Sequence, residues 1–124
     1  EQPGLIGALG LQQVGFEAAF TPAVEIGWRL LRSHWRQGYA LEAAEAVLAH
    51  AFEALQLREV LAFTVPANLP SQGLMQRLGM QHQVEQDFQH PLLPPGHPLR
   101  QHVLYRLSQA SWRQRIASRA IGGD

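Results

Sequence analysis

A short apolar segment, a glycine turn and an amphipathic helix follow one another between residues 24 and 55. Residues 24–30 alternate as a strand does, whereas apolar residues within 39–55 recur every three or four positions, which is the period of a helix. Between them stands Trp35-Arg36-Gln37-Gly38-Tyr39-Ala40. Backbone N–H groups in the first turn of a helix lack intrahelical partners and can bind an anion. We therefore expect an α/β fold with a cradle for a phosphate-bearing ligand at Gly38.

The rest of the chain predicts further strands and a second helix. Asn68 is a good N-cap, Pro70 suits a first helical turn, and Gly79 suits a helix end. A strand at 60–65 is expected to lie parallel to the one at 24–30, because a helix separates them. The other expected elements are strands at 5–14, 80–85 and 101–107, and a short basic helix in a tail at 108–124. Together they predict a mixed sheet with helices on both faces.

Length and composition restrict the class of protein. The 124 residues suffice for one core, so we expect a single domain over 1–124. A formal net charge of zero gives no electrostatic footprint for nucleic acid or an anionic membrane. The chain has no cysteine and no apolar run of membrane-spanning length, and a cytoplasmic location is expected. Because the sequence begins with Glu1 and enters a strand almost at once, we expect further residues to precede it.

Three segments together carry a resemblance to a known family. They are Glu25-Ile26-Gly27-Trp28-Arg29-Leu30, then Trp35 to Ala40 followed by Glu42-Ala43, and finally Asn68-Leu69-Pro70-Ser71 with Leu74-Met75 and Arg77-Leu78-Gly79-Met80. In this order and spacing they resemble the RimJ/RimL-like branch of the GNAT superfamily of acetyl-CoA-dependent N-acetyltransferases, over residues 4–107. The chain departs from the family at Trp35 and Arg36. Family members have a strand and one or two helices before the segment at Leu5 that are not seen in this sequence, so we expect an N-terminally incomplete domain.

The resemblance implies a GNAT acyl-CoA N-acyltransferase fold, whose central strands splay to form a slot for acetyl-CoA. It assigns the pantetheine arm to one strand and to the start of the later helix, and the pyrophosphate to the glycine turn. The cofactor-binding residues implied in this way are Trp28, Arg29, Leu30, Arg36, Gln37, Gly38, Tyr39, Ala40 and Asn68. Asn68 is expected both to cap its helix and to contact the ligand. Ser71 stands where family members can place a hydroxyl near the CoA sulfur.

Two polar residues are candidates for catalysis. A carboxylate within an apolar strand is costly unless it faces a wet cleft or is paired, so Glu25 is a candidate base. A structural ion pair between Glu25 and an arginine explains the position equally well. Ser71 is a candidate acid for the thiolate, and its alternative is hydrogen bonding at the helix N-terminus. Tyr105 is a further candidate acid, for which core packing is the favoured interpretation.

A proline-rich loop at 88–98 is expected to form a wall of the acceptor site. Asp87 and His90, at its start, are candidates for shaping the acceptor pocket. The slightly favoured alternative is a turn in which Asp87 bonds its own backbone. The histidines at positions 82, 90, 97 and 102 match no compact ligand spacing, so no metal is expected.

The resemblance implies acetyl transfer from acetyl-CoA to a primary amine, either a protein N-terminal α-amine or a small molecule. The amine would attack the thioester directly in a ternary complex, so the lack of cysteine is no obstacle. The alternative is a catalytically degenerate domain that binds CoA or serves regulation or dimerisation, and a homodimer stays open. A nucleotide-binding α/β protein is disfavoured, because neither G-x-x-x-x-G-K-[ST] nor G-x-G-x-x-G occurs in the chain.

Overall fold

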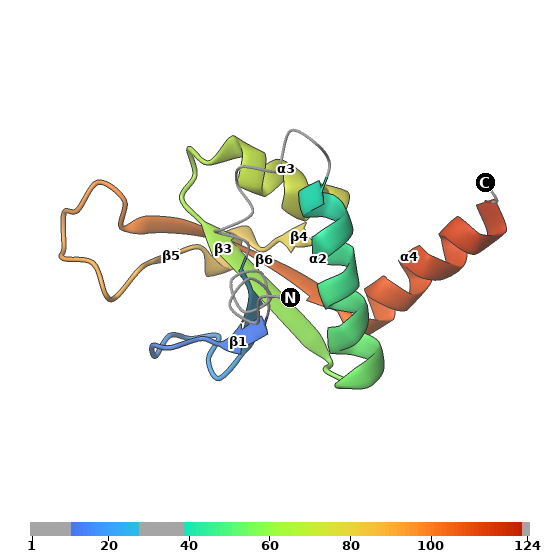
Figure 1. Ribbon diagram of the computed structural model, residues 1–124. Helices are drawn as coiled ribbons and strands as arrows, with labels where there is room; N and C mark the ends of the chain where they lie inside the picture. Colours follow the sequence, from blue (N-terminus) through green and yellow to red (C-terminus); the bar gives the residue numbers. More distant parts are fainter. Residues whose placement is uncertain (1–10, 28–38, 123–124) are drawn as a thin grey trace.

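The computed structural model describes residues 11–27 and 39–122, and within them it forms a mixed sheet packed with helices (Figure 1). Six strands run in the order β1-β2-β3-β6-β4, with β5 paired to β6. The strands are β1 (Leu11–Gln13), β2 (Val24–Ile26), β3 (Glu59–Thr64), β4 (Gln81–His82), β5 (Phe88–Gln89) and β6 (Gln101–Ser108). The helices are α2 (Tyr39–Ala49), its π-helical continuation η2 (His50–Ala54), α3 (Leu69–Arg77), the 3-10 helix η3 (Val84–Gln86) and α4 (Gln109–Gly122). The expected α/β class is confirmed.

β3 joins a parallel and an antiparallel half of the sheet. It lies parallel to β2, with Glu25 opposite Leu61, as expected from the helix between them. On its other side it pairs antiparallel with β6 along its whole length. The strand expected at 80–85 is shorter, because the chain turns into η3 after β4. The proline-rich loop closes a hairpin between β5 and β6, in which His90 N–H donates to the Arg100 carbonyl at 2.7 Å.

The helix expected at 39–55 is formed by α2 and η2. Leu48 and Phe52 are fully buried on its apolar stripe. The same spacing predicts that Leu55 is buried as well, which is wrong, since its side chain is 51% exposed. The Leu55 N–H donates to the His50 carbonyl, five residues back. This turn is wider than an α-helical turn, so it rotates Leu55 away from the core.

Local signals predict both ends of α3 correctly. Asn68 caps the helix, since its Oδ1 accepts a hydrogen bond from the Ser71 N–H at 3.2 Å, and Pro70 lies in the first turn. At the other end, Gly79 follows the C-cap Leu78 with φ of +87°, a left-handed conformation that favours glycine. α3 is thereby held at a defined position after β3.

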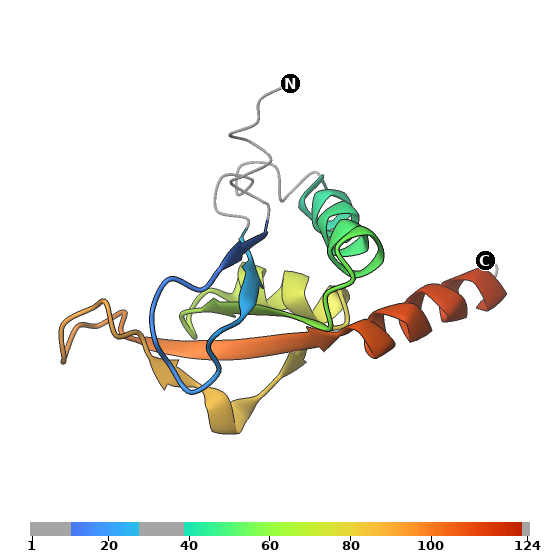
Figure 2. The ribbon, with the colours of Figure 1, turned by 90° about the horizontal axis from the view of Figure 1, so that it is seen from below.

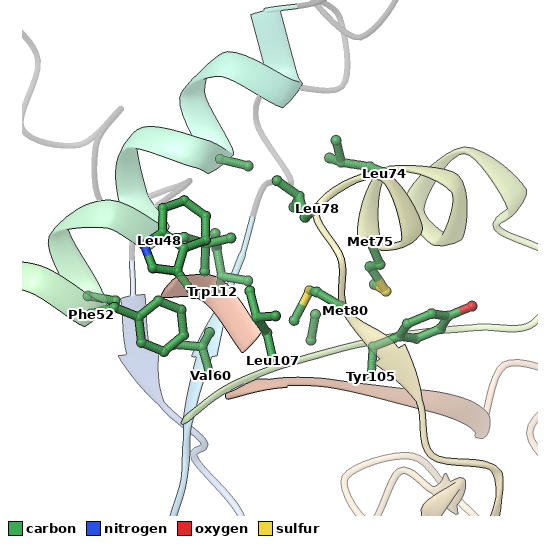
Figure 3. Close-up of a cluster of buried hydrophobic side chains, with 14 of the residues drawn as sticks. Leu48, Phe52, Val60, Leu74, Met75, Leu78, Met80, Tyr105, Leu107 and Trp112 are labelled. Atoms are coloured by element: carbon green, nitrogen blue, oxygen red, sulfur yellow. The ribbon is translucent and has the colours of Figure 1, made fainter. Parts of the chain in front are cut away.

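The main core lies between α2, α3 and one face of the sheet (Figure 3). Alternate residues of the two central strands face it, namely Val60 and Ala62 from β3 and Tyr105 and Leu107 from β6. The helices contribute Leu48, Phe52, Leu74, Met75 and Leu78 to the same cluster. These side chains fix α2 and α3 against the same two strands.

The opposite face of the sheet is covered by different elements, η3 and β5. Figure 2 shows α2 and α3 on one side of β6, and η3 with β5 on the other. In the described part of the chain, the expectation of helices on both faces is met on this side by one short segment, the 3-10 helix η3. The reason is that the apolar stripes of α2 and α3 both pack against the face that carries Val60 and Ala62.

The short basic helix expected in the C-terminal tail is present as α4, which is longer than expected and packs against the rest of the fold. Trp112 is 2% exposed, and its ring packs 5.8 Å from that of Phe52. Arg115 donates from Nη2 to Glu45 on α2 at 2.7 Å and to the Arg77 carbonyl at 3.2 Å. Beyond these contacts α4 runs away from the sheet (Figure 1). None of the described helices combines the length and apolar character needed to cross a membrane.

Candidate functional site

The expected cofactor-binding residues fall largely outside the described part of the chain. Trp28, Arg29, Leu30, Arg36, Gln37 and Gly38 lie within 28–38, so their roles stay predictions. Tyr39 and Ala40 form the start of α2, with Glu42 in the first turn. The splayed slot stays a prediction as well. The described side of the site therefore consists of β2, β3 and the N-terminal ends of α2 and α3.

Glu25 lies in the middle of β2 on the sheet face opposite to α2 and α3. Its neighbour Ile26 is 3% exposed and belongs to the main core, so Glu25 points the other way, as the alternation predicts. Its Oε2 accepts a hydrogen bond from Nε2 of Gln12 on β1 at 3.1 Å. The residue is half-buried, so water can reach a carboxylate that the strand holds in place. The catalytic role of Glu25 and its arginine alternative both stay predictions.

Asn68 and Ser71 lie together at the N-terminus of α3, just after β3 in the chain. Besides capping α3, Asn68 donates from Nδ2 to Oγ1 of Thr64, the last residue of β3, at 3.2 Å. Ser71 is 3% exposed. The capping role of Asn68 is confirmed, whereas its contact with pantetheine and the role of Ser71 as an acid stay predictions. The N-terminus of a helix carries partial positive charge, which favours a developing thiolate or oxyanion nearby.

The side chains of Asp87 and His90 contact different partners. The Asp87 carboxylate accepts a hydrogen bond from the Leu104 N–H at 2.9 Å and lies 2.9 Å from Nε2 of His82. The alternative of a self-bonded turn is therefore wrong in detail, because the nearest donors come from β6 and β4 and not from the loop. Asp87 holds η3 against the sheet, and its role in an acceptor pocket stays a prediction, as does that of His90.

Tyr105 is a core residue. Its side chain is 1% exposed, its ring stacks on His82 at 5.0 Å, and its hydroxyl donates to Oε1 of Gln72 at 3.0 Å. The same hydroxyl accepts from Nε2 of Gln76 at 3.2 Å. The favoured interpretation, core packing, is confirmed.

Sequence reasoning missed a cluster of aromatic rings on the sheet face that carries Glu25. We call it the ring face; its members are Phe16, Phe20, Phe63, Phe88, His90 and His102. Ring centroids lie 4.5 Å apart between Phe16 and His90, and 5.0 Å apart between His90 and His102. Part of this cluster follows from strand alternation, because Phe88 on β5 stands opposite His102 on β6. Nothing in the local sequence around Phe16 and Phe20, in the loop between β1 and β2, predicts that they join this cluster.

Both histidines of the ring face are shifted toward the neutral form. Burial lowers the pKa of His102 below its ordinary value of 6.5, and a hydrogen bond to the Arg100 carbonyl opposes this only in part. Burial also lowers the pKa of His90, and the neighbouring His102 lowers it further. At neutral pH the ring face is therefore an uncharged surface.

An open hollow of about 610 Å³ adjoins the ring face at Phe16. It is formed by the loop between β1 and β2, and its lining comprises Val14, Gly15, Phe16, Glu17, Ala18, Thr21 and Pro22. Pockets that bury most of a small ligand have volumes of about 300–1,000 Å³; this hollow has such a volume but is open to solvent. Among the described residues, no group of three histidine or acidic side chains is arranged to hold a metal ion.

Comparison with known proteins identifies the family. Residues 1–81 match the family model described as Acetyltransferase (GNAT) domain. The chain is 31% identical over 88 residues to Uncharacterized N-acetyltransferase YnaD of Bacillus subtilis (strain 168), covering 71% of this chain and 50% of YnaD. It is 35% identical over 92 residues to FsC-acetyl coenzyme A-N(2)-transacetylase of Aspergillus fumigatus, covering 74% of this chain and 39% of that protein. The chain thus spans half or less of the length of these relatives.

Comparison of the fold with solved structures leads to the same family. An acetyltransferase of the GNAT family from Bacillus anthracis superposes with a TM-score of 0.61 at 25% sequence identity, covering 81% of this chain and 57% of that one. The parallel pair β2 and β3, the helix between them and the capped α3 therefore form part of a GNAT fold. The family model, the relatives and the fold lead to one conclusion: the chain belongs to the GNAT family of acetyltransferases.

Proposed function

We propose that this chain transfers an acetyl group from acetyl-CoA to a primary amine, as a member of the RimJ/RimL-like branch. The observation that carries the proposal is the frame of β2, α2, β3 and α3, along which the three motif segments fall in order. In that frame Asn68 caps α3, four residues after the end of β3, and Glu25 lies on the neighbouring parallel strand. The relative named as an acetyl coenzyme A N(2)-transacetylase supports acetyl-CoA as donor and a nitrogen as acceptor.

The proposed reaction is a direct transfer in a ternary complex. The neutral amine attacks the thioester carbonyl carbon, the C–S bond breaks, and acetyl moves to the nitrogen. The proton lost by the amine passes to Glu25, directly or through water, because the carboxylate lies half-buried on an accessible sheet face. The CoA thiolate takes its proton from Ser71, which water then restores. Backbone N–H groups of α2 and α3 supply positive potential for the pyrophosphate and the oxyanion.

The pKa of the acceptor amine sets the free-energy cost of deprotonating it, and so how strongly the reaction depends on a base. Neutralising an α-amine with pKa about 8 at pH 7 costs only ~1.4 kcal/mol, whereas an amine near 10.4 costs roughly 4.6 kcal/mol. The half-buried Glu25 carboxylate helps the first more easily than the second. We therefore place protein α-amines and small amines of modest basicity ahead of lysine side chains.

The experiment is thiol release from acetyl-CoA with a panel of amines, followed by a thiol reagent. The chain has no cysteine, so the protein itself gives no background. Glu25→Gln should lower kcat about 100-fold or more and leave the dissociation constant of acetyl-CoA unchanged, as expected for loss of a base. Glu85→Gln, at an exposed carboxylate of η3, is the matched control.

Two results would contradict the proposal. If saturating acetyl-CoA leaves the melting temperature unchanged, the cofactor is wrong, because a ligand at 100 times its dissociation constant stabilises by about 2.7 kcal/mol. If acetyl-CoA binds but no amine releases thiol, the chain is the catalytically degenerate CoA-binding module instead. A wild-type rate in Glu25→Gln would remove Glu25 from the mechanism.

A further inference from the structure

We propose that Gln12 is a positioning residue for the transfer step, and that it orients the Glu25 carboxylate both with and without its proton. This inference rests on the proposed function, because Glu25 is the base of that reaction. It is carried by the pairing of β1 with β2, by the hydrogen bond from Gln12 to Glu25, and by the apolar residue on the other side of Glu25.

The register of β1 against β2 brings Gln12 to Glu25. The two residues stand directly opposite each other in the antiparallel pair, so their side chains lie on the same face, with Cβ atoms about 4.5–5.5 Å apart. The neighbouring pair, Leu11 opposite Ile26, faces the main core, where Ile26 is buried and Leu11 packs against the cluster. A slip of one residue would turn Leu11 out of the core. The packing that fixes β1 therefore also fixes Gln12 beside the carboxylate.

The surroundings of Glu25 differ on its two sides. β2 lies between β1 and β3, and the residue opposite Glu25 on β3 is Leu61, which is fully buried and has no polar side-chain atom. Of the two residues paired with Glu25 across the sheet, Gln12 is therefore the one that can donate from its side chain, and its Nε2 lies 3.1 Å from Oε2 of Glu25. A hydrogen bond to one oxygen restricts the rotation of a carboxylate. Efficient proton transfer to a base requires such a defined geometry.

An amide side chain suits a base that gains and loses a proton in each turnover. Nε2 of Gln12 donates to the ionised carboxylate. When Glu25 takes the proton of the attacking amine, its new O–H group donates to Oε1 of Gln12 after the amide rotates, until the proton passes to water. Lysine or arginine at this position would have no acceptor and would stabilise only the ionised form, and leucine would serve neither form. Gln12 thus keeps the base oriented through the whole cycle.

The test measures kcat against pH, with acetyl-CoA and amine both saturating, in wild type, Gln12→Leu and Gln12→Glu. Gln12→Leu should lower the plateau of kcat about fivefold through lost orientation, and should move the acidic limb up by about half a pH unit, because the ionised carboxylate loses a donor. Gln12→Glu places a second carboxylate there and should move the limb by about one unit. Both variants should keep the dissociation constant of acetyl-CoA and melt within about 3 °C of wild type, since exposed substitutions change stability little. Gln13→Leu is the matched control and should behave as wild type, because Gln13 is exposed and points to the other face of β1.

A double variant separates positioning from structural support. In the Glu25→Gln background, Gln12→Leu should cause no further loss of kcat, because Gln12 acts through the carboxylate. Equal losses in both backgrounds, a wild-type pH profile in Gln12→Leu, or the same change in Gln13→Leu would overturn the inference.

A measurement without turnover separates this inference from the proposed function. In NMR spectra, the side-chain amide signals of Gln12 should shift as Glu25 titrates, and they should lose that shift in Glu25→Gln. If wild type acetylates amines but these signals do not follow Glu25, the inference fails and the proposed function stands. If the signals follow Glu25 but no amine is acetylated, the proposed function fails, and with it the use of the pair in catalysis.

Discussion

Asn68 offers the sharpest test, because its stability role and its proposed ligand role can be measured apart. Its carboxamide has four hydrogen-bonding sites, and two are engaged, Oδ1 with the Ser71 N–H and Nδ2 with Thr64 Oγ1, both at 3.2 Å. One N–H and one lone pair remain for pantetheine. Asn68→Ala removes both bonds, while Asn68→Asp keeps the cap and removes only the amide donor.

The two variants should differ in stability. Loss of a cap costs about 1 kcal/mol, and loss of a half-buried neutral hydrogen bond about 1 kcal/mol more. For a domain of this size that total of about 2 kcal/mol lowers the melting temperature by roughly 8 °C. Asn68→Asp should stay within about 0.5 kcal/mol of wild type, since a carboxylate still accepts from Ser71, can accept from the Thr64 hydroxyl in place of the amide donor, and suits a helix N-terminus. Thermal unfolding without ligand measures both.

The same variants should agree in ligand binding. If Nδ2 donates to the pantetheine arm, Asn68→Asp loses that donor and should weaken CoA binding about tenfold, which is ~1.4 kcal/mol. Isothermal titration with CoA measures the change, with Leu92→Ala as the control. Wild-type affinity in Asn68→Asp would refute the ligand contact and leave the cap alone. An unchanged melting temperature in Asn68→Ala would refute the reasoning about the cap.

Three further predictions concern the core, the ring face and α4. Tyr105→Phe should cost about 1–2 kcal/mol in urea unfolding and leave kcat unchanged, because the buried hydroxyl serves α3; a kcat loss at full stability would contradict this. Burial lowers the pKa of His90 and His102 below 6.5 in the folded chain, so the unfolded chain takes up protons first as the pH falls. The free energy of unfolding should therefore decrease below about pH 6.5, and less so in the variant with both changed to Phe; equal slopes would exclude these histidines. Trp112→Ala should cost about 3–5 kcal/mol, with exposed Arg113→Ala neutral, and similar stabilities would mean that α4 is a detached tail.

Features that depend on neighbours in sequence could be predicted from the chain. The ends of α3 are an example, because Asn68, Pro70 and Gly79 each act through the backbone within a few residues. The parallel pairing of β2 and β3 follows in the same way from the helix between them. Leu55 shows where helical periodicity fails as a predictor of burial. The π-helical turn before it moves Leu55 off the apolar face of the helix, and the local sequence does not indicate that such a turn forms there.

Features that depend on register and on distant segments could not be predicted. Asp87 reads as a loop residue, yet its carboxylate bonds the Leu104 N–H, which the β6 register brings within reach. The ring face likewise joins Phe16 from one hairpin loop, Phe63 from β3 and Phe88 from another hairpin. Each of these residues alone is an ordinary apolar position. Their common location is set by which face of the sheet the helices leave open.

β3 contributes adjacent residues to the two faces of the sheet near the proposed site. Successive side chains of a strand point to opposite faces, so Phe63 enters the ring face while Thr64 lies on the side of α3 and accepts from the cap Asn68. The two residues are adjacent, about 3.3 Å apart along the strand. A thioester held near Asn68 would therefore lie at the end of β3, with Glu25 on β2 opposite Leu61, three residues before that end and on the face that carries Phe63. Slipping β3 by one residue would exchange the two faces, which makes the register of β3 against β6 the feature on which the whole site depends.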